Sequence, residues 1–192
     1  FAHTTAVPQP KYQAVMFCVM DVSGSMGTVE KDLAKRFFLL LYFFLQRQYQ
    51  SVQLVFVKHH HEATECSEDE FFRTREGGGT VVSPALELVQ SIQQQRYPAS
   101  EWNLYLAQAS DGDNHHLDNP VLAEVMEQLL AVFQAAFYVE VARNVPSDML
   151  QLYRQLQEKY PQLRTVQARD RRHLYPLFRE LFAQPAGGTQ AR

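Results

Sequence analysis

Apolar runs alternate with polar loops along the chain and predict strands. Residues 12–20 form a nearly continuous apolar run with β-branched and aromatic side chains, which is typical of a central strand covered on both faces. Similar patterns predict further strands at residues 51–57, 102–109, 136–142 and 163–168, and a short antiparallel edge strand at residues 63–66.

Helical patterns lie between these strands. Residues 28–49 contain neither Gly nor Pro and predict one long helix. Ser67 and Glu70 form a capping-box pattern, and Ser83 followed by Pro84 predicts the cap and first turn of a helix that runs to about residue 95. Further helices are expected at residues 120–134, 147–160 and 173–182. This order predicts an α/β fold: a doubly wound, mostly parallel sheet with one short antiparallel edge strand and helices on both faces.

The length and composition predict one folded domain. The 192 residues are 46% hydrophobic and 20% charged, which suffices for a sizeable core. Residues 1–10 and 185–192 are rich in Pro, Gly, Thr and Gln and are expected to be tails or linkers. The folded domain is therefore expected to span residues 11–184.

Charge, apolar length and cysteine content argue against several classes of protein. Eighteen Lys and Arg against 21 Asp and Glu give a net charge of -3, which argues against a nucleic-acid partner or an anionic membrane. The most apolar stretch, residues 37–45, is far shorter than the roughly 20 residues that span a bilayer. Cys18 and Cys66 are distant in sequence and Cys18 lies in an apolar run, which favours a reducing compartment over a disulfide framework.

Oxygen-bearing side chains directly follow the first predicted strand. Asp21, Ser23 and Ser25 are spaced by two residues, so an extended turn can aim all three side-chain oxygens at one point. Mg²⁺ takes six oxygens, keeps several waters, and usually accepts only one or two protein carboxylates. The segment therefore predicts a Mg²⁺ site, with Mn²⁺ or Ca²⁺ as alternatives. The competing interpretation is a polar turn that caps the next helix.

Two other loops can complete this site. Thr80 follows a glycine run that ends at Gly79 and can add a third hydroxyl, whereas Asp111 follows the strand at residues 102–109 and can add a second carboxylate. Asp113 is an alternative to Asp111. The carboxyl ends of parallel strands meet at one edge of a sheet, so these side chains are expected to converge. A plain flexible loop is the alternative for the glycine run, and no Gly-Lys-Ser/Thr follows to make a phosphate loop.

In their order, Asp21-Val22-Ser23-Gly24-Ser25, a distant Thr80 and a distant Asp111 resemble the metal-ion-dependent adhesion site of von Willebrand factor A domains. This resemblance implies that Ser23, Ser25 and Thr80 touch the cation. It also implies that Asp21 and Asp111 act mostly through water, and that a free coordination position accepts a Glu or Asp from a partner protein.

A narrower resemblance spans about residues 15–115. The segments FCVMDVSGSMG, EGGGTVVSPAL and RYPASEWNLYLAQASDGDN, with the tandem histidines, are similar to the bacterial YeaH/YhbH family. This similarity implies a cytoplasmic bacterial protein. Members of that family tend to occur beside a serine protein kinase and a SpoVR-like protein in stress or sporulation contexts, which makes those two proteins candidate partners.

Histidines cluster near the same predicted edge of the sheet. His59, His60 and His61 follow the second strand, and His115 and His116 follow the strand that precedes Asp111. Histidine titrates near neutral pH, so these side chains could sense pH, engage an anionic partner or hold a softer metal, although solvated loop histidines are the simpler alternative. The expected ligand-binding rim consists of Gly79, His60, His61, Asp113 and His115.

A binding module without enzymatic activity is the function that we expect from these features. The first alternative is a magnesium-dependent phosphatase-like enzyme with Asp21 as phosphoryl acceptor. However, Ser23 stands where phosphatases of the haloacid-dehalogenase type have a second Asp. A serine-hydrolase elbow also fails, because the glycines around Ser25 have the wrong offset. The second alternative is a scaffold in which the cation only orders the loops.

Overall fold

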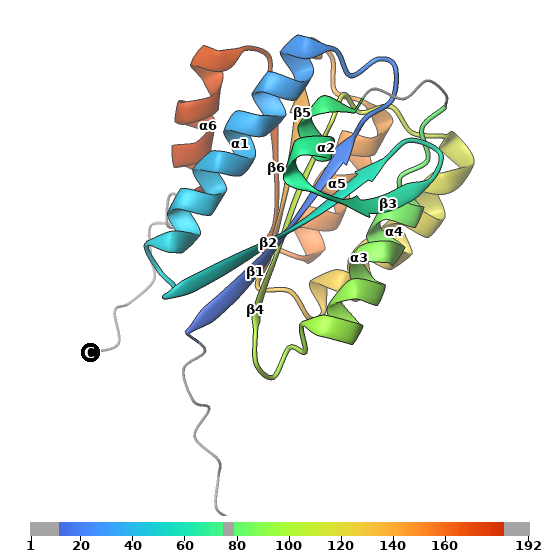
Figure 1. Ribbon diagram of the computed structural model, residues 1–192. Coiled ribbons are helices and arrows are strands. Elements are labelled where there is room, and N and C mark those ends of the chain that lie inside the picture. Colours follow the sequence, from blue (N-terminus) through green and yellow to red (C-terminus); the bar gives the residue numbers. More distant parts are fainter. Residues whose placement is uncertain (1–11, 75–78, 183–192) are drawn as a thin grey trace, which may run out of the picture.

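A computed structural model describes residues 12–74 and 79–182 (Figure 1). The expected tails at residues 1–10 and 185–192 lie outside the described residues, as do Gly77 and Gly78 of the glycine run.

One six-stranded sheet forms the centre of the fold, with the strand order β3-β2-β1-β4-β5-β6. All neighbouring strands are parallel except β3, which pairs antiparallel with β2 at the edge. The α/β fold class predicted from the sequence is confirmed. The strands are β1 (Gln13–Asp21), β2 (Ser51–His59), β3 (Ala63–Cys66), β4 (Asn103–Ser110), β5 (Ala135–Val141) and β6 (Leu163–Ala168).

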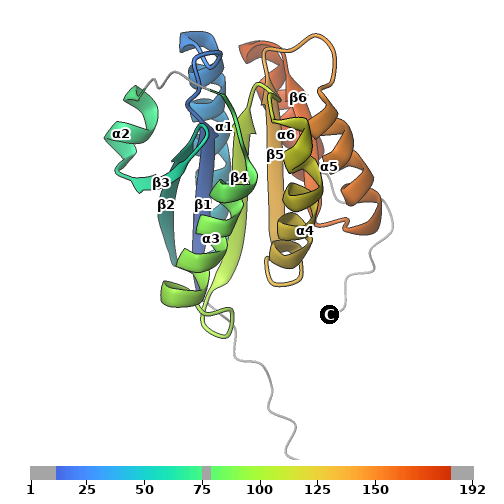
Figure 2. The same ribbon diagram turned by 90° about the vertical axis from the view of Figure 1, so that its right-hand side faces the viewer.

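Helices cover both faces of this sheet. Figures 1 and 2 show α1 and α6 together on one face and α3, α4 and α5 on the other, while α2 lies near the β3 edge. A short 3-10 turn, η1, precedes α4. The bounds are α1 (Thr28–Gln46), α2 (Glu68–Arg73), α3 (Ser83–Arg96), η1 (His116–Asp118), α4 (Asn119–Leu130), α5 (Asp148–Lys159) and α6 (Arg171–Phe182).

Strand β1 is buried on both faces, which explains its continuous apolar run. Its odd-numbered residues, such as Phe17, join the core under α3, α4 and α5. Its even-numbered residues join the core under α1, α2 and α6. Cys18 is among them and is fully buried, and burial raises the pKa of its thiol far above the usual range, so Cys18 is a small core residue.

The long apolar helix packs on the sheet. Phe37, Phe38, Leu41 and Leu45 of α1 are buried against the even-numbered face of β1. Among the described residues, none of the helices combines the length and apolar character needed to cross a bilayer.

Several element ends differ from those predicted. The capping box of Ser67 and Glu70 is present, and Ser147 caps α5. Ser83, in contrast, was expected to cap α3 and does not: it is the first helical residue, and its hydroxyl donates to Asp118. The first helix ends at Gln46 rather than at residue 49, and α4 ends at Leu130 rather than at residue 134.

A row of polar residues crosses the carboxyl edge of the sheet. Asp21 is the register partner of His59, and Ser110 follows Ala109, the partner of Met20. Ser110 in turn pairs with Glu140. His59, Asp21, Ser110 and Glu140 are fully buried, so the polar row lies beneath the loops that emerge from this edge.

Candidate metal centre

The turn after β1 brings together the three oxygen-bearing side chains of the first motif. The Asp21 carboxylate accepts a hydrogen bond from the Ser23 amide at 2.7 Å through Oδ1, and the hydroxyls of Ser23 and Ser25 lie 3.1 Å apart. Val22 and Met26 are buried and anchor the turn in the core. Asp21 and Ser23 are buried while Ser25 is exposed, so the turn presents its oxygens from the protein interior outward to solvent.

Backbone hydrogen bonds tie this turn to the two other predicted loops. The Val22 amide donates to the His59 carbonyl at 2.9 Å, and the Val81 amide donates to the His60 carbonyl at 2.8 Å. The His115 amide then donates to the Thr80 carbonyl at 3.0 Å. The segments that carry Asp21, Thr80 and Asp111 therefore converge at one edge of the sheet, as expected from the sequence.

Asp111 is held by a tightly packed turn. Its side chain is 8% exposed and its Oδ1 accepts from the Asp113 amide at 3.1 Å. The next residue, Gly112, has φ +87°, and its amide donates to the Ser110 hydroxyl at 3.0 Å. The charge of Asp111 contributes to the raised pKa of the Asp21 carboxyl.

Asp118 joins the Thr80 loop to the Asp111 loop. Its Oδ2 accepts from the amides of Val82 at 3.1 Å and Ser83 at 3.0 Å, and its Oδ1 accepts from the Ser83 hydroxyl. Asn114 adds a further acceptor for the Val82 amide at 3.2 Å. Asp118 thus accepts from the free amides at the start of α3, which is the capping role that the sequence predicted for Ser83. It also fixes the segment directly after Thr80.

Several acidic side chains lie near this edge, and together with burial they disfavour the ionised form of Asp21. Burial first, and then the nearby charges of Asp111 and Asp113, raise the pKa of Asp21 to about 6, although hydrogen bonds from Ser23 lower it. The Asp21 Oδ2 atom is buried and has no hydrogen-bond partner among the described residues. A cation would neutralise these charges and give Oδ2 a partner, directly or through a bound water.

The hydroxyl spacing also fits a small cation. Two neighbouring ligands at about 2.1 Å from an octahedral ion lie roughly 3.0 Å apart, and the Ser23 and Ser25 hydroxyls lie 3.1 Å apart. The described residues contain no group of three or more His, Cys, Asp or Glu side chains that could hold a metal. The hydroxyls and carboxylates at this edge therefore suit a hard cation. The described residues offer no histidine cluster that would hold a softer metal.

Most of the histidines predicted at this edge lie at the surface. His61, His115 and His116 are exposed and His60 is half-buried, with the ring pairs of His60 with His61 and of His115 with His116 in contact. The prediction was wrong for His59, because β2 continues two residues beyond its apolar pattern. His59 is fully buried, and burial lowers its pKa to about 4.

Gly79 and Asp113 also lie at this edge and are exposed. Asp113 forms an ion pair with Arg143, from the loop after β5. Because Asp113 is exposed and already paired while Asp111 is buried, the geometry favours Asp111 over Asp113 as the outer carboxylate of the cation site.

Sequence reasoning missed the residues that support the site from below. Glu140 is fully buried, accepts from the Ser147 hydroxyl and amide, and accepts from Gln167 at 2.8 Å. The Tyr138 hydroxyl forms a hydrogen bond with the Ser110 hydroxyl at 3.0 Å. A lone Glu at the end of the apolar segment AAFYVEV was the only signal available for this network, since a charged residue inside a buried strand usually has a partner.

Comparison with known sequences places the chain in a bacterial group. Residues 1–185 match the family described as "Protein of unknown function (DUF444)". A UPF0229 protein of Legionella pneumophila (strain Corby) is 48% identical over 183 residues, covering 95% of this chain and 44% of the relative. UPF0229 protein PputGB1_0427 of Pseudomonas putida (strain GB-1) is 49% identical over 180 residues, covering 91% and 42%. The chain therefore spans less than half the length of the curated relatives it matches.

Solved structures share the fold at low identity. The PilB minor pilin of Streptococcus sanguinis superposes with a TM-score of 0.62 at 11% identity, covering 90% of this chain and 61% of that chain. The pilus adhesin SpaC of Lactobacillus rhamnosus GG has a TM-score of 0.61 at 10% identity, and the match covers 90% of this chain and 30% of that chain. Manganese-loaded TRAP of Plasmodium vivax has a TM-score of 0.57 at 16% identity, and the match covers 90% of this chain and 74% of that chain. These likenesses show a von Willebrand A-like fold, and the sequence match shows that the chain belongs to the DUF444 family.

Proposed function

We propose that this chain is a divalent-cation-dependent protein-binding domain. In this proposal Ser23, Ser25 and Thr80 contact Mg²⁺, while Asp21 and Asp111 act mostly through bound water. The observation that carries the proposal is the buried Oδ2 of Asp21, which has no hydrogen-bond partner in the described part of the chain, together with two hydroxyls at the spacing of neighbouring octahedral ligands. Manganese-loaded TRAP has a similar fold, which supports Mn²⁺ as an alternative ion.

The partner in this proposal supplies a Glu or Asp side chain to an open coordination position. Such a carboxylate would enter between the exposed Ser25 and the exposed rim formed by Gly79, His61, Asp113 and His115. The cation attracts the incoming carboxylate, and the fixed Ser23 and Asp111 hold the ion in place. The resemblance to YeaH/YhbH proteins makes a serine protein kinase or a SpoVR-like protein of a bacterial stress or sporulation system the first partners to test.

The proposal assigns no chemical reaction to the site. A phosphoryl-transfer enzyme would need a group to handle the proton of the leaving oxygen, and Ser23 occupies the position two residues after Asp21. Turnover of p-nitrophenyl phosphate that requires Mg²⁺ and is lost in Asp21→Asn would contradict this assignment.

A binding assay with purified partners tests the proposal. The kinase and the SpoVR-like protein from the same bacterium are titrated against the chain in Mg²⁺ and in EDTA. Binding should weaken at least about tenfold in EDTA and in Ser23→Ala, since the cation makes the central contact. Ser100→Ala changes an exposed serine in the loop between α3 and β4 and serves as the matched control. Binding of either partner that is indifferent to EDTA and to Ser23→Ala would show that the cation does not mediate docking and only orders the loops.

A further inference from the structure

A second surface lies outside the cation site, in the groove between α1 and α6. Two adjoining hollows of about 270 and 500 Å³ share Leu40, Phe43 and Tyr175 and so form one continuous groove, which we call the α1/α6 groove. Figure 1 shows the two helices side by side, and the Phe44 and Phe178 rings pack edge to face beneath the groove with centroids 6.2 Å apart. The groove therefore rests on a packed helix pair.

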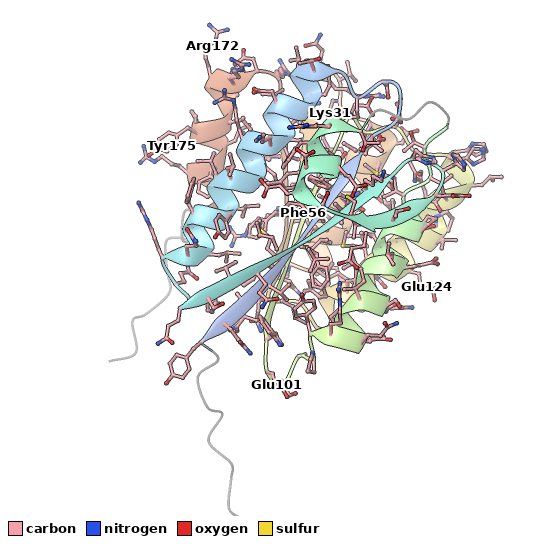
Figure 3. The ribbon with its side chains drawn as sticks, viewed as in Figure 1. Lys31, Phe56, Glu101, Glu124, Arg172 and Tyr175 are labelled. Atoms are coloured by element: carbon pink, nitrogen blue, oxygen red, sulfur yellow. The ribbon has the colours of Figure 1, made fainter. Side chains whose placement is uncertain are left out.

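The groove exposes large apolar side chains. Phe43 is 56% exposed and Tyr175 is 63% exposed, and Tyr175 points away from the sheet in Figure 3. Leu39, on the turn before Phe43, is 40% exposed. Helix α1 already buries an apolar face against the sheet, so these residues make a second apolar face, which the described segments leave uncovered.

Arginines flank this apolar face at both ends. Arg36 and Arg171 line one end, and Arg47 and Arg179 line the other, whereas no acidic residue is among the described residues that line the groove. Asp32 pairs with Arg36 and Arg171 at 2.8 Å each, but Arg47 and Arg179 form no ion pair within the described part of the chain. The groove is thus locally positive on a chain whose net charge is -3.

We infer that the α1/α6 groove binds an amphipathic helix of a partner protein, with an apolar face flanked by Asp or Glu. The span from Arg36 to Arg47 covers about 11 residues, or roughly 16 Å of helix, which matches a three-turn segment with apolar residues at positions i, i+3 or i+4, and i+7. Acidic flanks on that segment would neutralise Arg47 and Arg179. This inference does not depend on the cation, because the groove residues lie on helices and not in the metal-site loops.

Charge also disfavours two other occupants. A symmetric contact with a second copy would place the four arginines of one groove against those of the other, so like charges would meet. The ends of this chain, residues 1–11 and 183–192, contain no Asp or Glu and cannot supply the acidic flanks.

Peptide selection tests the inference without a known partner. A phage-displayed library of random peptides of about 14 residues is selected on the chain and depleted against Phe43→Ser. Enriched peptides should share the helical apolar spacing with flanking Asp or Glu. A synthetic consensus peptide should bind at least about tenfold more weakly to Phe43→Ser and to the double variant Arg47→Glu and Arg179→Glu.

Matched controls separate the groove from general surface effects. Val121→Ser on α4 and Arg154→Glu on α5 change exposed residues of the same kinds elsewhere and should leave peptide binding unchanged. EDTA should also leave it unchanged, so failure of the cation proposal would not affect this result. All variants alter exposed side chains, and their thermal melting temperatures should match wild type.

Several outcomes would overturn the inference. These are a selection with no enriched peptides, enriched peptides without acidic flanks, or equal binding to wild type and the groove variants. Sedimentation that shows a wild-type dimer dissociated by Phe43→Ser would assign the groove to a second copy instead. Groove-dependent binding of phosphatidylglycerol vesicles without peptide binding would assign it to a membrane surface.

Discussion

Gly112, in the Asp111 turn, occupies a position that does not tolerate a side chain. Its φ is +87°, and a Cβ atom would lie 2.5 Å from the Ser147 hydroxyl oxygen and 2.6 Å from the Ser147 Cβ. Ser147 is held by Glu140 and caps α5, so it cannot move away cheaply. We expect Gly112→Ala to lower the free energy of unfolding by about 2–4 kcal/mol, measured by urea denaturation in EDTA.

Gly24 provides the control for that substitution. It lies in the Asp21 turn, has no atom within 4 Å of a built Cβ, and does not have a positive φ. Gly24→Ala should change the free energy of unfolding by less than about 0.5 kcal/mol. Equal effects of the two substitutions would mean that the Glu140 and Ser147 network does not constrain the Asp111 turn.

His59 predicts a specific dependence of stability on pH. Burial lowers its pKa to about 4, while the charge of Asp118 opposes and that of His60 reinforces this shift. The unfolded chain takes up a proton on this histidine near pH 6.5, and the folded chain does so only near pH 4. The free energy of unfolding should therefore fall as pH decreases from about 6.5 to 4, by up to a few kcal/mol from this residue.

The comparison of wild type with His59→Leu isolates this contribution from that of Asp21, whose raised pKa acts in the opposite direction over part of the same range. Neither ring nitrogen of His59 has a hydrogen-bond partner among the described residues, so the apolar replacement breaks no such bond. Chemical denaturation between pH 4 and 8 should show a smaller decrease in the variant. Parallel pH profiles would show that His59 takes up its proton at the same pH in the folded and unfolded chains.

Among the elements, the junction of α3 with the loop before α4 controls the position of Thr80. Asp118 accepts from the Val82 and Ser83 amides and from the Ser83 hydroxyl, and the Thr80 carbonyl accepts from His115. Asp118→Ala would leave the Ser83 amide and hydroxyl buried without an acceptor, and would leave the Val82 amide with Asn114 alone. We expect a loss of about 2–4 kcal/mol of stability by denaturant titration, and weaker Mn²⁺ binding by calorimetry.

Asp148→Ala is the matched control, because Asp148 is an exposed carboxylate in the first turn of α5. Its loss should cost no more than about 0.3–1 kcal/mol and should not change Mn²⁺ affinity. If Asp118→Ala kept full Mn²⁺ affinity despite its lower stability, the junction would support the fold without positioning the cation ligands.

The helices and strands themselves were largely predictable from the sequence, but the residues at which they end and the distant side chains that cap them were not. The apolar run of β1 predicts a buried central strand because both of its faces meet a core. His59 was placed in a loop because polar residues beyond Val57 hide the continuation of β2. Ser83 fits the cap pattern locally, and only the fold brings the distant Asp118 to the start of α3.

For the whole molecule, the sequence predicted where the candidate site lies because parallel strands collect their carboxyl ends at one edge. It could not predict the pairing of Asp113 with Arg143, since these partners meet only after β5 is placed beside β4. The hydrogen bond between Glu140 and Ser147 was also hidden, because it depends on the path of the loop after β5. The α1/α6 groove was equally hidden, because one apolar helix gives no sign that a second helix lies beside it.

Cation binding by the chain itself is the most direct test of the central claim. Isothermal calorimetry with Mg²⁺ and Mn²⁺ on wild type, Ser23→Ala and Ser100→Ala measures it without any partner. We expect one site in wild type and Ser100→Ala, and an affinity at least about tenfold lower in Ser23→Ala, because one inner-sphere hydroxyl is lost. Absence of binding in wild type, or equal binding in Ser23→Ala, would show that these residues do not form the proposed cation site.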